Sequence, residues 1–230
     1  RPKVPKSNVW HHEDKFHGTK VSSKIVTIKK IIKQDKADYL FITSNESVCW
    51  LLNLRGSDLA YTPIFMSRLI IDKYGNCYLF ANIKNPIKFP KEINLSIIKP
   101  KFFNKFLSTT LAMKKIVADD RTLPANINKL FHEIKSKVKL RNNPIELLKS
   151  QKNITELKGV RSAHLRDGVA LTKSILWIKD RRSKWTLTEL QAVKKIDSNR
   201  KAEKYFHSLS FPTIAGSGPN GAIVHYHATK

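Results

Sequence analysis

Residues 22–43, SSKIVTIKKIIKQDKADYLFIT, decide the fold class because they pair a helix with a strand. Ile25, Ile28 and Ile32 recur at helical spacing, and the serines in front of them are suited to cap a helix. The apolar residues 39–43 that follow have the length of a buried strand. A helix that leads directly into a buried strand indicates a mixed α/β layer.

The neighbouring segments extend this layer. Residues 48–54 form another apolar run of strand length, where we expect a second strand. Residues 68–72 and 77–83 flank a turn-rich connection that contains Gly75, which predicts a β-hairpin. Residues 127–140 are predicted to be one helix, with an apolar face formed by Ile127, Leu130, Phe131, Ile134 and Val138.

The sequence changes character near residues 141–153. Arg141-Asn142-Asn143-Pro144 interrupts the helical pattern. A long helix is predicted from Thr155 to about Lys179, and a shorter one after Thr188, which is a plausible cap. We therefore expect an α/β domain over residues 1–150 and a mostly helical region over residues 151–230.

The chain is strongly basic, with a formal net charge of +25 over 230 residues. Such a charge suggests a nucleic-acid-binding module. Lys, Ile and Asn, however, make up 71 of the residues, and A- and T-rich codons encode all three. The sequence contains no block of five or six like charges. We therefore favour compositional bias, and nucleic-acid binding remains the minor alternative.

The sequence also indicates the cellular compartment in which the protein is expected. Cys49 and Cys77 each lie in an apolar segment, which predicts buried, reduced thiols and a cytoplasmic setting. No apolar run approaches the roughly 18 residues that indicate a membrane helix. The start, Arg1-Pro2-Lys3-Val4-Pro5, has neither an initiator Met nor the apolar core of a signal peptide, so we expect a piece of a longer protein.

A glycine-rich segment lies near the C-terminus. Gly216-Ser217-Gly218-Pro219-Asn220-Gly221 matches the pattern G-x-G-x-x-G. A dinucleotide site would also need an acidic residue about 20 positions later, whereas only nine residues follow Gly221. Pro219 also removes one N–H group from the proposed phosphate cradle. We expect a tight structural loop instead.

Two groups of histidines are candidates for chemistry. His11, His12, Glu13, Asp14 and His17 have the composition of a metal cluster, but adjacent histidines do not share a helix face, so we expect an exposed polar segment. His225 follows the apolar run 222–224, where we expect a terminal strand. An imidazole at the end of a strand, after a glycine loop, is a candidate functional residue.

Three longer segments carry a family resemblance. They are Trp50-Leu51-Leu52-Asn53-Leu54-Arg55-Gly56-Ser57-Asp58, Arg161-Ser162-Ala163-His164-Leu165-Arg166-Asp167-Gly168-Val169-Ala170-Leu171, and residues 209–226, which include His225-Tyr226. In this order they resemble aminopeptidase P, a family of metallopeptidases that remove an N-terminal residue preceding proline.

The resemblance implies a fold and a cofactor. Residues 1–150 would form a creatinase/aminopeptidase P N-terminal-type mixed sheet with flanking helices, and residues 151–230 an incomplete α+β pita-bread segment. The family holds a pair of metal ions, usually manganese, through two aspartates, a histidine and two glutamates. The motifs with the first aspartates lie downstream of the His-Tyr pair and are not present after Tyr226. We therefore carry over no metal ligand and expect no cofactor on this chain.

The resemblance assigns one site residue. His225 matches the histidine with which the family contacts its substrate, a peptide containing proline. Without the metal ligands, the chain is expected to be a truncated form that is inactive alone. Two alternatives remain open: a non-catalytic subunit that pairs with a separately encoded remainder of the enzyme, and a basic module that binds a partner or nucleic acid.

Overall fold

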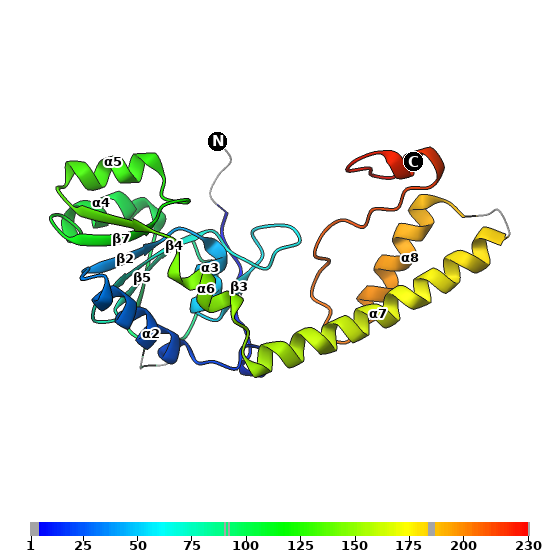
Figure 1. Cartoon of the computed structure of the whole chain (residues 1–230), viewed down its shortest axis with the longest axis horizontal. Coiled ribbons are helices and arrows are strands. Elements are labelled where there is room, and N and C mark those ends of the chain that lie inside the picture. The colour runs from blue at the N-terminus through cyan, green and yellow to red at the C-terminus, as the bar shows by residue number, and fades with distance from the viewer. Residues whose placement is uncertain (1–4, 90, 92, 184–186, 230) are drawn as a thin grey trace. The chain divides into compact units, whose positions relative to one another are not determined.

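The computed structural model describes residues 5–89, 91, 93–183 and 187–229, without the side chains of residues 182 and 183. The first four residues, on which the expectation of a missing N-terminal part rests, lie outside the described ranges. The chain divides into two compact units, Arg1–Glu156 and Leu157–Lys230, which are described separately (Figure 1).

The first unit is built on a six-stranded mixed sheet with the strand order β6-β5-β4-β2-β7-β8. Strands β2, β7 and β8 are parallel, β4 runs antiparallel to both β2 and β5, and β6 is parallel to β5. The expected hairpin is confirmed as β4 and β5. The strands are β2 (Tyr39–Ile42), β4 (Ser67–Asp72), β5 (Cys77–Ala81), β6 (Leu95–Ile98), β7 (Lys115–Asp119) and β8 (Lys137–Arg141). A separate antiparallel pair joins β1 (Val9–His11) to β3 (Leu54–Gly56).

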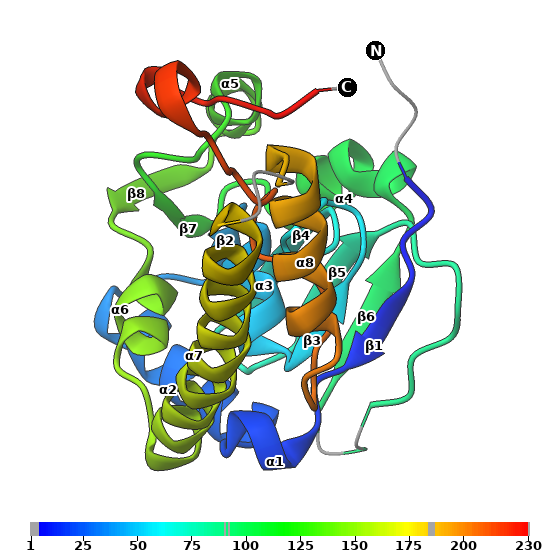
Figure 2. The ribbon, with the colours of Figure 1, turned by 90° about the vertical axis from the view of Figure 1, so that its right-hand side faces the viewer.

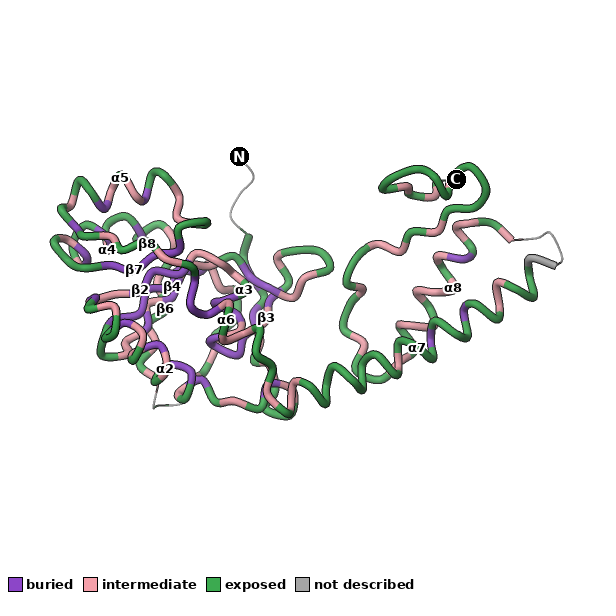
Figure 3. The backbone as a smooth tube through the Cα atoms, in the orientation of Figure 1, coloured by how far each residue is buried: buried purple, intermediate pink, exposed green. Residues whose placement is uncertain are grey.

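Helices cover both faces of this sheet (Figure 1). One face packs against α2 (Val21–Gln34), α3 (Asn45–Leu51) and α6 (Pro144–Ser150), and the other against α4 (Phe103–Thr110) and α5 (Ala125–Glu133). Each face of the sheet has its own hydrophobic core, because successive side chains of a strand point to opposite faces. Leu40 and Ile42 lie in the core under α2, α3 and α6, and Phe41 lies in the core under α4 and α5. Figure 3 shows buried backbone, in purple, along the central strands of the sheet. The mixed α/β fold class is confirmed.

Two short elements complete the first unit. Helix α1 (Asp14–His17) precedes α2, and the 3₁₀ helix η1 (Pro100–Phe102) leads into α4. Both cysteines are buried and free, and burial raises the pKa of Cys49 to about 11 and that of Cys77 to about 12. The prediction of buried thiols is confirmed.

The strand expected over residues 48–54 is wrong. Ser44 caps α3, since its Oγ accepts a 3.2 Å hydrogen bond from the Ser47 amide. The apolar run therefore starts inside a helix and ends in the short strand β3. A continuous apolar run fits a buried helix as well as a buried strand, and here the Ser44 cap favours the helix.

The single helix expected over residues 127–140 is also wrong. Helix α5 ends at Glu133, and Lys135 adopts a left-handed conformation with φ of 56°. The chain then pairs with β7 as β8. Residues 137–141 alternate Lys, Val, Lys, Leu and Arg, a period of two that belongs to a strand.

The second unit contains α7 (Ile154–Ser183) from Leu157 onward, α8 (Glu189–Lys201) and the 3₁₀ helix η2 (Gly218–Ala222). Both predicted helices are confirmed, and Thr188 caps α8 through a reciprocal capping box with Gln191. Helices α7 and α8 lie side by side (Figures 1 and 2). The Arg200 guanidinium donates to both carboxylate oxygens of Asp167, at 2.7 and 3.2 Å. No helix in the described part of the chain is long and apolar enough to cross a membrane.

Candidate functional site

The segment that carries His225 is tied to the start of α8 by one carboxylate. Glu189 Oε1 accepts a 2.6 Å hydrogen bond from the Ser217 amide, and its Oε2 accepts one from the Tyr226 hydroxyl. The Asn220 Nδ2 lies 3.1 and 3.2 Å from the two oxygens and 3.0 Å from the Tyr226 hydroxyl. We call residues 216–227 the His225 loop, and Glu189 is its anchor.

These contacts also explain why the pKa of Glu189 is low. The Tyr226 hydroxyl, followed by the Ser217 amide, lowers the pKa of Glu189 below its ordinary value. Hydrogen bonds to a carboxylate favour its charged form. The sequence did not single out Glu189, because nothing in its spacing links the first residue of a helix to a loop nearly 30 positions later.

His225 itself is exposed, at a left-handed backbone position with φ of 57°. The strand expected at residues 222–224 is wrong, because η2 and a turn occupy this stretch. A strand needs a partner strand, and the described residues of the second unit contain none. Within the described residues, no hydrogen bond is formed by the His225 ring, which leaves its nitrogens available to a ligand.

The glycine-rich segment is a structural loop. No strand precedes it among residues 202–217, and a short 3₁₀ helix follows it, so the strand–turn–helix setting of a dinucleotide site is not present there. Gly216 is required by a close approach, because a Cβ at this position would lie 2.9 Å from the Asn220 carbonyl oxygen.

The N-terminal histidine segment does not behave as one exposed stretch. His11, Glu13 and Asp14 are exposed, but His17 is buried, so the expectation fails for this residue. His17 Nδ1 accepts a 3.2 Å hydrogen bond from the Thr19 amide, and its Nε2 lies 2.9 Å from Asp14 Oδ1. His17 therefore belongs to the interior of the first unit.

His17 is part of a polar cluster with the buried Lys24 and Asn53 and the half-buried Asn153 and Glu156. The Lys24 ammonium donates to the Asn53 side-chain oxygen at 2.6 Å, and the Asn153 Nδ2 donates to the His17 carbonyl at 2.8 Å. Asn153 and Glu156 also cap each other at the start of α7, with bonds of 2.9 Å in both directions. The cluster fixes the first turn of α7 in the first unit.

The family resemblance implies a metal centre, which we compared with the side chains present. Among the described residues, no three His, Cys, Asp or Glu side chains are grouped so that they could hold a metal ion. The donor set of a two-metal site is therefore not found in this part of the chain, and we derive no chemical step through a metal.

Comparison with known proteins gives two family matches. Residues 1–156 match the Creatinase/Prolidase N-terminal domain family, and residues 158–230 match metallopeptidase family M24. Xaa-Pro aminopeptidase 1 of Dictyostelium discoideum is 32% identical over 98% of the chain, and a probable Xaa-Pro aminopeptidase P of Laccaria bicolor is 34% identical over 98%. The chain spans 36% of the length of each.

A solved structure agrees with these matches. X-prolyl aminopeptidase from Caenorhabditis elegans, described as a cytosolic enzyme with a di-nuclear active site, aligns with 96% of the chain and 39% of its own length. The TM-score is 0.81 and the sequence identity is 25%. The chain therefore belongs to the Creatinase/Prolidase N-terminal domain family over residues 1–156, continues into metallopeptidase family M24, and is a partial aminopeptidase P homologue.

Proposed function

We propose that this chain is part of an Xaa-Pro aminopeptidase, in which the His225 loop contacts a peptide with proline in its second position. The observation that carries the proposal is the exposed imidazole of His225 on a loop held by Glu189. The matches to Xaa-Pro aminopeptidases along 98% of the chain support it.

His225 can act on such a peptide in one of two ways. Its ring can donate a hydrogen bond to the carbonyl oxygen of the peptide bond, where negative charge develops during attack, or donate a proton to the proline nitrogen as that nitrogen leaves. Either role requires a ring that is free of protein partners and a backbone that holds it in place. The Glu189 contacts to Ser217 and Tyr226, on both sides of the loop, supply the second requirement.

The metal of the complete enzyme would come from residues other than those described here. A metal pair, which we propose to be manganese, would supply the nucleophile and polarise the peptide carbonyl. The described side chains contain no group that could hold it. We therefore propose that these 230 residues do not hydrolyse peptides alone.

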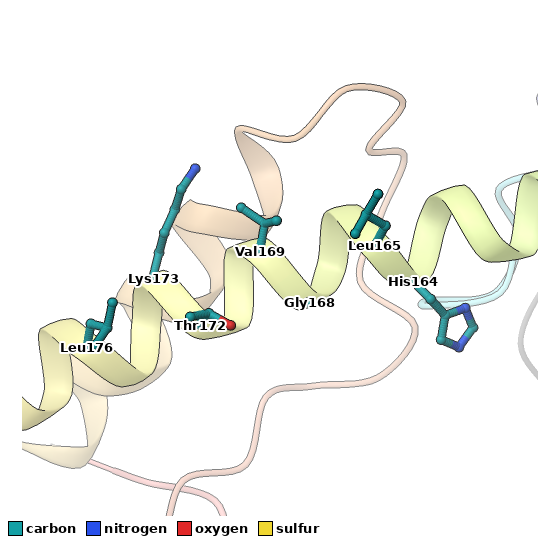
Figure 4. Close-up of a pocket in the computed structure, with 7 residues that line it drawn as sticks. All are labelled: His164, Leu165, Gly168, Val169, Thr172, Lys173 and Leu176. Atoms are coloured by element: carbon teal, nitrogen blue, oxygen red, sulfur yellow. The ribbon is translucent and has the colours of Figure 1, made fainter.

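Activity would then need a partner that supplies the rest of the metallopeptidase domain. The exposed face of α7 supports this, because it carries large apolar side chains, including Leu165 at 73% and Leu176 at 62% exposure. Figure 4 shows these residues along a shallow pocket of about 440 Å³ that α7 forms. A separately encoded remainder of the enzyme would cover this face in a cytoplasmic complex, for which the two free thiols are suited.

The test is a peptidase assay on three samples: the chain alone, the missing parts of a relative alone, and the two together. Release of the N-terminal residue from an Xaa-Pro peptide should require both components and manganese. Metal-dependent release by the chain alone would contradict the proposal. Failure of the mixture, with the two components bound to each other, would favour a non-catalytic subunit.

One observation favours a second candidate, the basic binding module. The formal net charge of +25 would attract a polyanion. If the charge reflects composition alone, DNA binding should be weak, dependent on salt and indifferent to sequence. Affinity for one sequence thousands of times above that for random DNA would favour the module over the peptidase.

A further inference from the structure

The first unit contains an open surface cavity of about 440 Å³, with polar and apolar lining, that the proposed peptidase function does not use. It lies beyond the ends of β2 and β7, where the loops that lead into α3 and α5 begin. The start of β4 and the first turn of α6 close it from the side. Its polar lining includes Thr43, Asn45, Glu46, Arg68, Thr122 and Glu146.

The strand topology favours a ligand-binding crevice at the carboxyl ends of β2 and β7. Strands β2 and β7 are parallel neighbours, so both carboxyl ends meet at this edge of the sheet. The helix after β2, α3, packs on one face, whereas the helix after β7, α5, packs on the other. Where the connections of two neighbouring parallel strands diverge in this way, open α/β sheets bind their ligands.

One side of the cavity offers hydrogen-bond donors. Arg68 is half-buried and its guanidinium lies 4.7 Å from the centre of the Phe103 ring, but no hydrogen bond or ion pair among the described residues uses its nitrogens. Asn45 uses its oxygen to accept from the Ser67 amide at 2.8 Å, and in the described part of the chain the acceptor that its Nδ2 faces is the Met66 sulfur at 3.6 Å. A thioether is a weak acceptor, so both donors are available to a planar anion such as a carboxylate.

The other side offers acceptors. The Thr122 hydroxyl donates to Asp119 Oδ2 at 2.7 Å and must therefore accept from Thr43 at 2.6 Å, which leaves an acceptor position on the Thr43 oxygen. Glu46 is exposed and accepts from the Ser44 hydroxyl, and Glu146 accepts from Arg121. No cation in the described residues pairs with Glu46, so the lining carries an unneutralised carboxylate.

We propose that this cavity binds a small zwitterion, an amino acid or short peptide, whose carboxylate takes the Arg68 and Asn45 donors and whose ammonium takes Glu46 and Thr43. The unpaired carboxylate of Glu46 disfavours a multiply charged anion such as phosphate, because like charges repel. The proposal does not depend on the peptidase function.

The experiment is an NMR titration of the 230-residue chain with the dipeptide L-alanyl-L-alanine. We expect saturable shifts of the amides of Thr43, Ser67 and Thr122. N-acetylalanine, which lacks the ammonium, alaninamide, which lacks the carboxylate, and inorganic phosphate should each bind more weakly. Tighter binding of phosphate, or no saturable shift of these amides by the dipeptide, would overturn the proposal.

Variants assign the two ends of the ligand. Arg68→Gln should weaken dipeptide binding by about 10-fold or more, the equivalent of one charge-assisted hydrogen bond. Glu46→Gln should weaken binding of the dipeptide but not of N-acetylalanine. Arg166→Gln, the same change at a half-exposed arginine of α7 in the second unit, is the matched control and should not alter dipeptide binding. If Arg68→Gln fails to fold, Arg68→Lys, which keeps the charge but loses the planar fork, takes its place. Equal effects of the Arg68 and Arg166 changes would contradict the assignment.

Discussion

The Lys24 ammonium lies 3.9 Å from the centre of the Trp50 ring and donates a 2.7 Å hydrogen bond to the Trp50 carbonyl oxygen. Lys24 is only 4% exposed, and burial lowers its pKa to about 8, although Glu156 raises it and Arg55 lowers it further. The amine stays in the interior because two acceptors and an aromatic face surround it.

Lys24→Met should therefore destabilise the first unit by about 1–3 kcal/mol, because the Trp50 carbonyl and the Asn53 side-chain oxygen would lose their donor in a buried place. Urea unfolding followed by tryptophan fluorescence measures the change. Lys30→Met, at an exposed position of the same helix, should stay within about 0.5 kcal/mol of the parent. Equal stability of the two variants would show that these hydrogen bonds contribute nothing.

Acidification should weaken the first unit between pH 6.5 and about 4. Burial, followed by the charges of Arg55, His17 and Lys24, lowers the pKa of His12 to about 4, and burial also lowers the pKa of His17. In this window the unfolded chain binds more protons than the native one, so the free energy of unfolding decreases as pH falls. Urea midpoints measured from pH 7 to pH 4 test this.

The matched variants for the pH experiment are His12→Gln and His132→Gln. His12→Gln should make the free energy of unfolding less dependent on pH, because it removes a histidine that stays neutral in the native state. The second changes an exposed histidine and should leave the slope unchanged. A parent protein equally stable at pH 7 and pH 4 would rule out the linkage.

Glu189→Gln should loosen the His225 loop without unfolding α8. The carboxylate accepts from Ser217, Asn220 and Tyr226, and a neutral amide accepts more weakly and from only one oxygen. Hydrogen exchange of the Ser217 amide should become faster. Glu203→Gln, which affects only a 3.8 Å contact with Lys173, is the control. Unchanged exchange in Glu189→Gln would mean that the loop is held by other contacts.

His225→Ala should lower the turnover of the complete enzyme by about 10²–10⁴-fold, the usual contribution of a group that assists proton transfer or charge stabilisation. Manganese binding should be unchanged, because no group of metal ligands lies among the described residues around it. His227→Ala, two residues away, should have little effect. Equal effects of the two changes, or loss of metal binding in His225→Ala, would show that His225 has another role.

The elements that could be predicted from the sequence are those whose local sequence signal fits a single structure. The isoleucines of α2, the hairpin of β4 and β5, and the Thr188 cap each carry a local signal that agrees with the final packing. The errors fall where a local signal was ambiguous. The apolar run that contains Val48 suits a helix or a strand, and Val138 continues the helical spacing of Phe131 although the chain turns at Lys135.

Sites made from distant segments were less predictable. His225 was found because a short motif surrounds it, and its role stays a prediction. Its anchor Glu189, and the pairing of Lys24 with Asn53, depend on contacts between residues about 30 positions apart. Hydrophobic period and turn chemistry describe neighbours along the chain, so they contain no information on such contacts.

The position of strand β8 shows how the basic composition opposes self-association of the protein. It is one of the two edge strands of the six-stranded sheet, and Lys137, Lys139 and Arg141 occupy alternate positions along it. Asp35 neutralises only part of this charge, through contacts with Lys139 and Arg141. Two molecules that met edge to edge would place rows of cations against each other, which opposes intermolecular strand pairing. Since the screening length is about 8 Å at physiological ionic strength and shorter at high salt, concentrated salt would weaken this barrier to self-association.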